Sequence, residues 1–380
     1  MRVCYFGTYR SEYARNQILI EGLRRNGVEV IECHETLWHG TDDRVHITLG
    51  GWRNPGFWVR AFKAYSRLLW RHRSCEYDVM VVGFPGQFDV FLARILTWLR
   101  RKPLVWDVLT SIYLIACERQ LDLTSPFTVK ALRVLENIAC RLPDQLLLNT
   151  EEYVAWYGLT YNIPSTRFRL VPMGADDRFF QPRSASPRSD AQFRVIYYGA
   201  FIPNHDVLCI VDAARELVRE DQIHFFMIGD GPMRGVAEAT ARSYALANIT
   251  FTGWMEKKDL TEQVACADLC LGIFGATPQA LMTFNNKIFE CLAMAKPVIT
   301  GETPPLRKLF EHGKHLFLTN RSDPQALAEA IIHLKSHPEL TKSLASNGYQ
   351  YYLENFTPTH LGAIMLKHLS ELVDRAPNSQ

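Results

Sequence analysis

The stretch RVCYFGTYRSEYARNQILIEGLRRNGVEVIEC, residues 2–33, alternates an apolar run, an amphipathic segment and a second apolar run. Arg2–Phe6 predicts a buried strand, Asn16–Asn26 a helix closed by a glycine, and Val28–Cys33 the next strand. A strand–helix–strand unit joins two parallel strands by a crossover. The chain therefore opens as an α/β protein.

The same alternation continues along the chain and is interrupted once, by the polar segment Gln181–Gln192, which we interpret as a linker. We expect two Rossmann-like doubly wound domains, residues 1–180 and 193–357, facing a central cleft at the carboxyl ends of their strands. A final amphipathic helix, within residues 358–375, is expected to pack back on the first domain. The further predicted strands are Tyr77–Gly83, Leu104–Trp106, Gln145–Asn149, Phe193–Tyr198, His224–Ile228, Ile249–Thr252, Leu269–Ile273 and Pro297–Thr300.

Composition excludes several classes of protein. The 380 residues are 47% hydrophobic and 22% charged, as in a soluble globular protein, and the net charge of +2 argues against nucleic acid as a partner. The start MRVCYFGTYR is interpreted as a short strand with a turn, so we expect no signal peptide, and because no run of about 18 apolar residues occurs we expect no transmembrane helix. The nine cysteines are odd in number and mostly isolated, which predicts buried free thiols in a reducing cytoplasm and no metal site.

The stretch NNKIFECLAMAKPVIT, Asn285–Thr300, carries the clearest chemistry. A loop with two amide side chains, Asn285 and Asn286, leads into a short helix whose N–H groups and partial positive charge suit a diphosphate. Lys287 adds a full positive charge to the same place. Glu290, one turn on, can accept hydrogen bonds from two ribose hydroxyls; it can equally serve only to stabilise the helix start.

This stretch resembles the signature P-N-K-x-F/Y-E-…-A-x-G-K-P-V-I of the family-4 retaining glycosyltransferases, which have the GT-B fold. Three more segments resemble family motifs in the family's order and spacing: VPMGADDRFFQP from Val171, MIGDGPMR from Met227 and ITFTGWMEKKDL from Ile249. The resemblance implies that Glu290 binds the ribose and that Trp254 and Met255 flank the base. It also implies that Gly199, Gly229 and Gly231 line the nucleotide site.

Two of these assignments have plain alternatives. The glycines of MIGDGPMR can simply provide a tight turn between a strand and a helix. Trp254 can be a half-buried aromatic of the core.

The sequence departs from the family pattern at three positions. The first Glu of the family's E-x7-E motif falls on Met282, and its R-x4-K pair falls on Ala200 and His205. The resemblance implies a reaction without a metal or cofactor, in which a UDP- or GDP-type sugar is the co-substrate. Lys287 and His205 would then stabilise the leaving diphosphate.

The first domain is expected to hold the acceptor, a glycan or a lipid-linked molecule. Its first loop resembles the loop that faces the cleft in a subset of these enzymes. Asp107 and Ser111 follow the end of a strand, so their side chains are expected to point into the cleft. Asp107 would contact the acceptor or the reacting sugar, or else cap a helix. The candidate residues are Gly7, Thr8, Arg10, Arg15, Asp107 and Ser111.

Two basic and aromatic segments suggest contact with a membrane. In residues 58–73 a helical stripe of Arg60, Lys63, Arg67 and Arg71 is flanked by aromatic side chains, and residues 96–102 are similar. Residues 1–150 carry 20 Lys or Arg against 15 Asp or Glu. Such a helix can lie on an anionic membrane surface, or can be packed on the core with a solvated basic face.

Together these features predict a retaining glycosyltransferase that acts on a glycan or lipid-linked acceptor, in the cytoplasm and at the inner face of its membrane. The alternative is a catalytically weak partner subunit that binds a nucleotide sugar within a glycan-assembly complex. The departures at Met282 and Ala200 are the reason to keep it. An epimerase of the same fold would need further acids at the cleft, for which we find no pattern.

Overall fold

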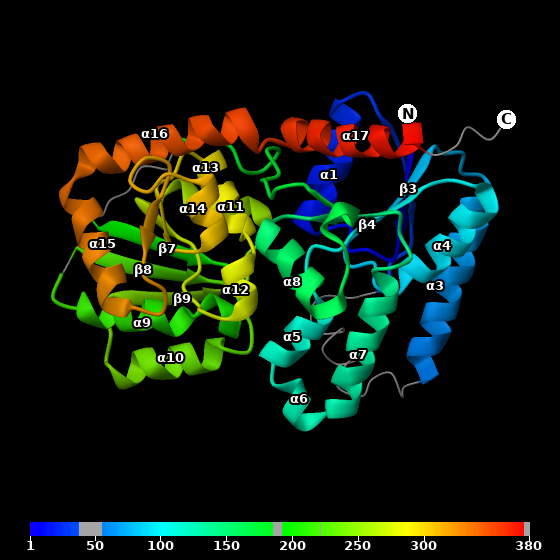
Figure 1. Ribbon diagram of the computed structural model, residues 1–380. Coiled ribbons are helices and arrows are strands. Elements are labelled where there is room, and N and C mark those ends of the chain that lie inside the picture. The colour runs from blue at the N-terminus through cyan, green and yellow to red at the C-terminus, as the bar shows by residue number, and fades with distance from the viewer. Residues whose placement is uncertain (38–54, 185–191, 221, 376–380) are drawn as a thin grey trace. The chain divides into compact units, whose positions relative to one another are not determined.

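The computed structural model describes residues 1–37, 55–184, 192–220 and 222–375 (Figure 1). The chain divides into two compact units. Unit 1 is Met1–Pro172 with Pro358–Gln380, and unit 2 is Met173–Thr357. Each unit holds one parallel six-stranded sheet covered by helices, which confirms the predicted GT-B class of α/β fold. Most of the predicted linker, residues 185–191, lies outside the described residues.

The sheet of unit 1 has the strand order β2-β1-β3-β4-β5-β6. The strands β3 to β5 are buried along their whole length, as expected for apolar runs covered on both faces. The sequence did not predict β6, a run of only three residues. The strands are β1 (Arg2–Gly7), β2 (Glu29–His34), β3 (Val79–Val82), β4 (Leu104–Asp107), β5 (Gln145–Leu148) and β6 (Phe168–Leu170). The helices are α1 (Ala14–Arg25), α3 (Pro55–Arg73), α4 (Asp89–Arg100), α5 (Ile112–Glu118), α6 (Leu121–Thr124), α7 (Pro126–Ala139), α8 (Glu151–Tyr161), η2 (Ser165–Arg167) and α17 (Pro358–Arg375).

The sheet of unit 2 has the order β12-β11-β10-β7-β8-β9, so the chain order reverses beside the central strand β7. Ligands of doubly wound sheets bind at the carboxyl ends of the strands at such a reversal. The strands are β7 (Phe193–Tyr198), β8 (Ile223–Ile228), β9 (Ile249–Gly253), β10 (Leu269–Leu271), β11 (Val298–Gly301) and β12 (Phe317–Thr319). The helices are η3 (Pro203–His205), α9 (Val207–Glu216), α10 (Arg234–Ser243), α11 (Lys257–Ala265), α12 (Pro278–Met282), α13 (Asn286–Ala293), α14 (Pro304–Leu309), α15 (Pro324–Ser336) and α16 (Pro338–Asn355).

Several helices of unit 2 begin at a side chain that accepts a backbone N–H. Asp206 caps α9, Asn285 caps α13, and Asp323 caps α15. Such caps satisfy donors that the first helical turn leaves without an intrahelical partner. The sequence therefore sets the start of α13, and with it the position of the residues that follow.

The last helix, α17, belongs to the core of unit 1. Its buried Leu361, Met365 and Leu369 pack in the same apolar cluster as residues of α1. The two helices meet at glycines: a Cβ on Gly362 would lie 2.1 Å from the carbonyl of Gly22. Within the described residues, no helix is long and apolar enough to cross a lipid bilayer.

The contact between α1 and α17 predicts the effect of adding one methyl group. Gly362→Ala should lower the free energy of unfolding by about 1–3 kcal/mol, because the new Cβ overlaps the backbone of α1. Gly235→Ala, in the exposed helix α10 where a Cβ would meet no atom within 4 Å, is the control and should be neutral or stabilising by about 0.5–1 kcal/mol. Denaturant unfolding of both variants measures the difference, and equal losses would contradict the packing.

Candidate functional site

The candidate site lies at the carboxyl ends of β7 and β8, where three glycines bring the backbone of two loops together. Gly199, Gly229 and Gly231 all have positive φ, at 129°, 134° and 150°. A Cβ on Gly229 would lie 1.9 Å from the carbonyl oxygen of Gly199, and a Cβ on Gly231 would lie 2.7 Å from that of Phe201. The glycines are therefore needed for the close approach of the two backbone segments as well as for the turn. Gly229 N–H also donates to Gly253 O at 2.8 Å, which ties β9 to the same edge.

Lys287 extends over this edge from the first turn of α13. Asn285 caps the helix: its Oδ1 accepts the N–H of Lys287 at 3.1 Å. The side chain of Lys287 is 3% exposed, and its Nζ lies 3.7 Å from the centre of the Tyr197 ring. Nζ would also lie 3.4 Å from a Cβ on Gly199. The ammonium thus rests on the face of an aromatic ring at the end of the central strand.

The amine of Lys287 has no hydrogen-bond partner within the described residues, and neither has Oδ1 of the adjacent Asn286. Burial lowers the pKa of Lys287 to about 7. A buried cation without a counter-charge is costly to the fold, and an anion at the same place would offset that cost. The N-terminus of α13 favours an anion at the same point.

His205 is held as a neutral ring beside Lys287. Its Nδ1 lies 2.8 Å from Tyr197 Oη, which itself donates to Ala200 O at 2.9 Å, so the ring carries its proton on Nδ1. Asn285 Nδ2 donates to Nε2 at 3.2 Å. Burial, and then the charge of Lys287, lower the pKa of His205 well below its ordinary value. We expected His205 to stabilise a leaving diphosphate together with Lys287; as a neutral ring it brings no positive charge, and it holds the capping amide of Asn285.

Glu290 lies one turn beyond Lys287 and is 9% exposed. Tyr198 Oη donates to its Oε2 at 2.9 Å, and no hydrogen bond to Oε1 is formed within the described part of the chain. Burial raises the pKa of Glu290, which the hydrogen bond from Tyr198 opposes. One carboxylate oxygen is thus held by the protein, and the other can accept hydroxyl groups of a ligand.

Trp254 follows β9 and is 69% exposed, so the alternative that it is a half-buried core aromatic is wrong. Its neighbour Met255 is half-buried. Because Gly253 accepts the N–H of Gly229, both side chains start at the same sheet edge as the glycine loops. An exposed indole at that edge offers a flat apolar face to a ligand.

Sequence reasoning missed the two tyrosines that end β7. Tyr197 carries Lys287 on its ring and holds His205 with its hydroxyl, and Tyr198 holds Glu290. Both look like ordinary strand residues in the sequence. Their position could have indicated this role, since two phenol groups directly precede Gly199 at the end of the central strand.

In unit 1, the first loop is held by a buried carboxylate. Asp89, at the start of α4, accepts the backbone N–H of Thr8 at 2.7 Å and also its hydroxyl. Gly7 has φ of 129°, and a Cβ there would lie 2.5 Å from Asp89 Oδ2. Arg10, also in this loop, is ion-paired to Glu12 at 2.8 Å.

Arg15, Asp107 and Ser111 do not face an open site, contrary to our expectation. Arg15 and Asp107 form a buried ion pair at 2.7 Å, with side chains 2% and 0% exposed. Arg15 also donates to the carbonyl oxygens of residues 171 and 172. Ser111 is 0% exposed, caps α5 through Leu114 N–H, and donates to the buried Glu136. These side chains hold unit 1 together, and the helix cap foreseen for Asp107 belongs to Ser111.

Comparison with known proteins identifies the segment that holds this site. Residues 192–337 match the model of the family "Glycosyl transferases group 1". Residues 192–337 are a group 1 glycosyltransferase domain. The site built on β7, β8 and α13 lies wholly within this glycosyltransferase domain.

Two curated proteins are similar in sequence. Alpha-D-kanosaminyltransferase of Streptomyces kanamyceticus is 24% identical over 286 residues, which are 73% of this chain and 70% of that protein. An uncharacterized glycosyltransferase of Methanocaldococcus jannaschii is 27% identical over 156 residues, or 41% and 42% of the two chains.

Solved structures show the same fold around the glycosyltransferase domain. Anabaena HepE in complex with UDP-glucose matches with a TM-score of 0.68 at 16% identity, over 98% of this chain and 100% of that one. The sucrose-phosphate synthase of Thermosynechococcus elongatus matches with a TM-score of 0.70 at 16% identity, over 98% and 99%.

The unpaired amine predicts a stabilising substitution. Lys287→Met should raise the free energy of unfolding of the ligand-free protein by on the order of 1–3 kcal/mol, because it removes a buried polar group without a partner. The folded amine has a pKa of about 7 and the unfolded one its ordinary, higher value. The unfolded chain therefore holds a proton that the folded chain lacks between these values, so wild-type stability should rise with pH across this window.

Thermal unfolding at pH 6 and pH 9 measures this effect. The advantage of Lys287→Met should be larger at pH 6. Lys342→Met, at an exposed lysine of unit 2, is the matched control and should change stability by less than about 0.5 kcal/mol at either pH. A Lys287→Met protein that is less stable than wild type would contradict the conclusion that the buried amine destabilises the ligand-free protein.

Proposed function

We propose that the protein is a retaining, metal-independent glycosyltransferase that takes its sugar from a nucleoside diphosphate sugar of the UDP or GDP type. The observation that carries the proposal is the buried, unpaired ammonium of Lys287 at the N-terminus of α13. A diphosphate supplies the missing counter-charge and accepts the helix N–H groups. UDP-glucose, which is present in the HepE complex, is a nucleoside diphosphate sugar of this type, and the Streptomyces relative is named for a glycosyl transfer.

Each residue of the site has a definite part in this proposal. Lys287 and the N–H groups of α13 bind the diphosphate and stabilise the charge that develops as it leaves, in place of a metal ion. Glu290 accepts the ribose hydroxyls with the oxygen that Tyr198 leaves free. Gly199 and Gly229 let backbone approach the phosphates, and Trp254 and Met255 flank the base. Retention of configuration rests on the family resemblance.

We further propose that the acceptor is a glycan or lipid-linked molecule at the cytoplasmic face of a membrane. The helix α3 exposes Trp58, Phe62 and Trp70, at 58%, 74% and 73%, between exposed Arg and Lys residues. On α4, Trp98 is 73% exposed. Arg100, at the end of α4, donates to carbonyl oxygens at the end of α3, so the C-terminal ends of the two helices, which carry Trp98 and Trp70, are neighbours.

A groove beside this surface has the chemistry of an anionic headgroup site. It measures about 670 Å³ and is lined mostly by apolar and basic side chains, among them Trp98, Arg101 and Lys102. One carboxylate also lines it, that of Asp144, which is ion-paired to Arg94 at 3.0 Å. Aromatic rings enter the interfacial region of a bilayer, while Arg and Lys are attracted to anionic lipids. Exposed aromatic residues between basic ones are therefore better explained by a membrane surface than by a solvated helix face.

A partner subunit that binds a nucleotide sugar with little catalysis is the second candidate. The observation in its favour is the neutral His205, which leaves Lys287 as the cation closest to the helix N-terminus. Thermal shifts and transfer assays with several UDP- and GDP-sugars separate the two. A binder gains stability without turnover, and a transferase shows both.

Substitutions in α13 test the donor site. Lys287→Ala and Glu290→Ala should each lower kcat/KM by about 10²-fold or more, because each removes a group that contacts the diphosphate or the ribose. Lys314→Ala, at an exposed lysine of the same unit, should leave the rate unchanged. Affinity for UDP should fall as pH rises above about 7, since the amine of Lys287 then loses its charge. Wild-type rates in both α13 variants would refute the site.

Liposome sedimentation tests the membrane surface. Wild type should sediment with anionic vesicles at low salt and less so at high salt, and the pair Trp70→Ser and Trp98→Ser should weaken this binding because it removes the two most exposed indoles of the surface. Leu159→Ser, at an 89% exposed apolar residue of α8, should bind as wild type does. Equal recovery of all proteins in the supernatant would reject the surface.

A further inference from the structure

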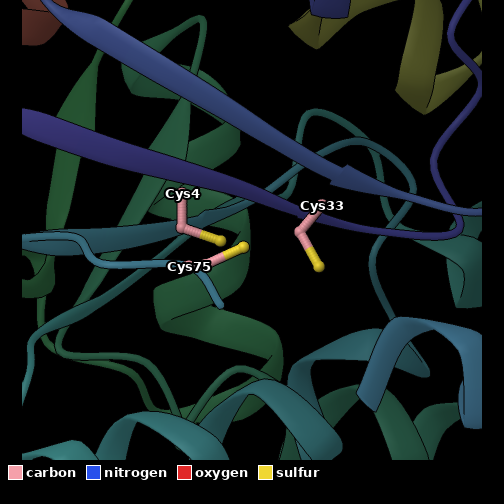
Figure 2. A group of neighbouring side chains, drawn as sticks. All are labelled: Cys4, Cys33 and Cys75. Carbon is pink, nitrogen blue, oxygen red and sulfur yellow. The ribbon is translucent and has the colours of Figure 1, made fainter. Parts of the chain in front are cut away.

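Three cysteines that are far apart in the sequence lie together in unit 1. Cys4 is on β1, Cys33 is on β2, and Cys75 lies between α3 and β3. All three are buried and free, and their sulfur atoms lie within 4.8 Å of one another (Figure 2). They are buried and free, as expected, but residues isolated along the sequence meet in space. The parallel register of β1 and β2, with Phe6 opposite Cys33, places two of them on neighbouring strands.

We propose that Cys4, Cys33 and Cys75 bind one soft metal ion, with Cu(I) as the ion that suits the site best. The inference does not depend on the proposed function, since these residues lie outside the glycosyltransferase domain. Thiolate sulfur selects soft ions such as Cu(I) and Zn(II) over Mg(II) or Ca(II).

The distances fit such an ion. Metal–sulfur bonds of about 2.3 Å place the three sulfurs of a planar site about 4 Å apart. The separations of up to 4.8 Å need only small side-chain rotations to reach that arrangement.

The number of ligands favours Cu(I) over Zn(II). Structural zinc sites nearly always have four ligands. Across the described residues, the group contains these three sulfurs and no His, Asp or Glu. A three-ligand thiolate set is therefore incomplete for zinc and sufficient for a copper ion of lower charge.

One positive charge lies close to the group, because the guanidinium of Arg100 donates to the Cys75 carbonyl oxygen. The Cys33 and Cys75 thiols donate to carbonyl oxygens of α3, at Leu68 and Arg71, and these hydrogen bonds are given up when the thiols bind a metal as thiolates. On binding, each coordinated thiol releases its proton to solvent and the metal ion takes its place.

A metal at this point would link β1, β2 and the segment after α3. By joining residues 4, 33 and 75, the metal ion would close long loops of the chain, so metal binding should stabilise unit 1. This effect gives a readout that is independent of enzyme activity.

The test is an anaerobic titration of the reduced full chain with Cu(I) held by a chromophoric chelator. Wild type should withdraw a single Cu(I) per chain and its unfolding temperature should rise. Cys33→Ser and Cys75→Ser should lose this uptake. Cys140→Ser, at a buried free thiol of the same unit that lies outside the group, should retain it.

X-ray absorption of copper-loaded wild type gives a second measurement that needs no variant. The spectrum should show a copper ion surrounded by sulfur alone, and nitrogen or oxygen ligands would overturn the proposal. So would equal copper uptake by wild type and Cys33→Ser. A disulfide within the group of the purified protein, with no copper uptake after reduction, would assign the thiols to redox chemistry and also overturn the metal site.

Discussion

The site of unit 2 depends on one electrostatic constraint, a buried amine that has no hydrogen-bond partner within the described residues. The amine of Lys287 lies over the ring of Tyr197 and beside the backbone of Gly199, where a Cβ would lie 3.4 Å from Nζ. The rest of the site is arranged so that this charge is tolerated and left unsatisfied.

The neighbouring groups keep the site close to neutral. Burial lowers the pKa of Lys287 and raises that of Glu290, so each side chain is pushed toward its uncharged form. His205 is neutral as well. An anion that enters would restore the charge of the lysine, so binding and proton uptake are coupled. The free energy that the fold loses by burying the amine is recovered when a ligand binds, a relation common to functional sites that oppose stability.

The order of the strands could be predicted because every run that we interpreted as a buried strand became one. The strands β6 and β12 could not, since three-residue runs such as FRL and FLT carry no periodicity. The helix start before Lys287 indicated an anion site, whereas the roles of Glu290 and the glycines were implied by the family resemblance. The supporting tyrosines were not, because an apolar run does not tell which of its hydroxyl groups will find a partner.

The failures in unit 1 have one cause. Arg15, Asp107 and Ser111 stand at ends of elements, where exposed polar residues are common, and burial cannot be read from such a position alone. The structure pairs them with each other or with Glu136. The cysteines were misjudged for a related reason: spacing along the chain does not reveal that residues 4, 33 and 75 meet.

The discontinuity of unit 1 has a consequence for biosynthesis. Unit 2 is a continuous segment and can complete its core once residue 357 has left the ribosome. Unit 1 cannot, because the apolar side of α1 is covered by Leu361, Met365 and Leu369, which follow unit 2 in the chain. Domains generally fold as units during synthesis, the N-terminal one first. Here the first unit to be translated is finished only after unit 2, and the nascent chain carries an open apolar face until α17 has been made.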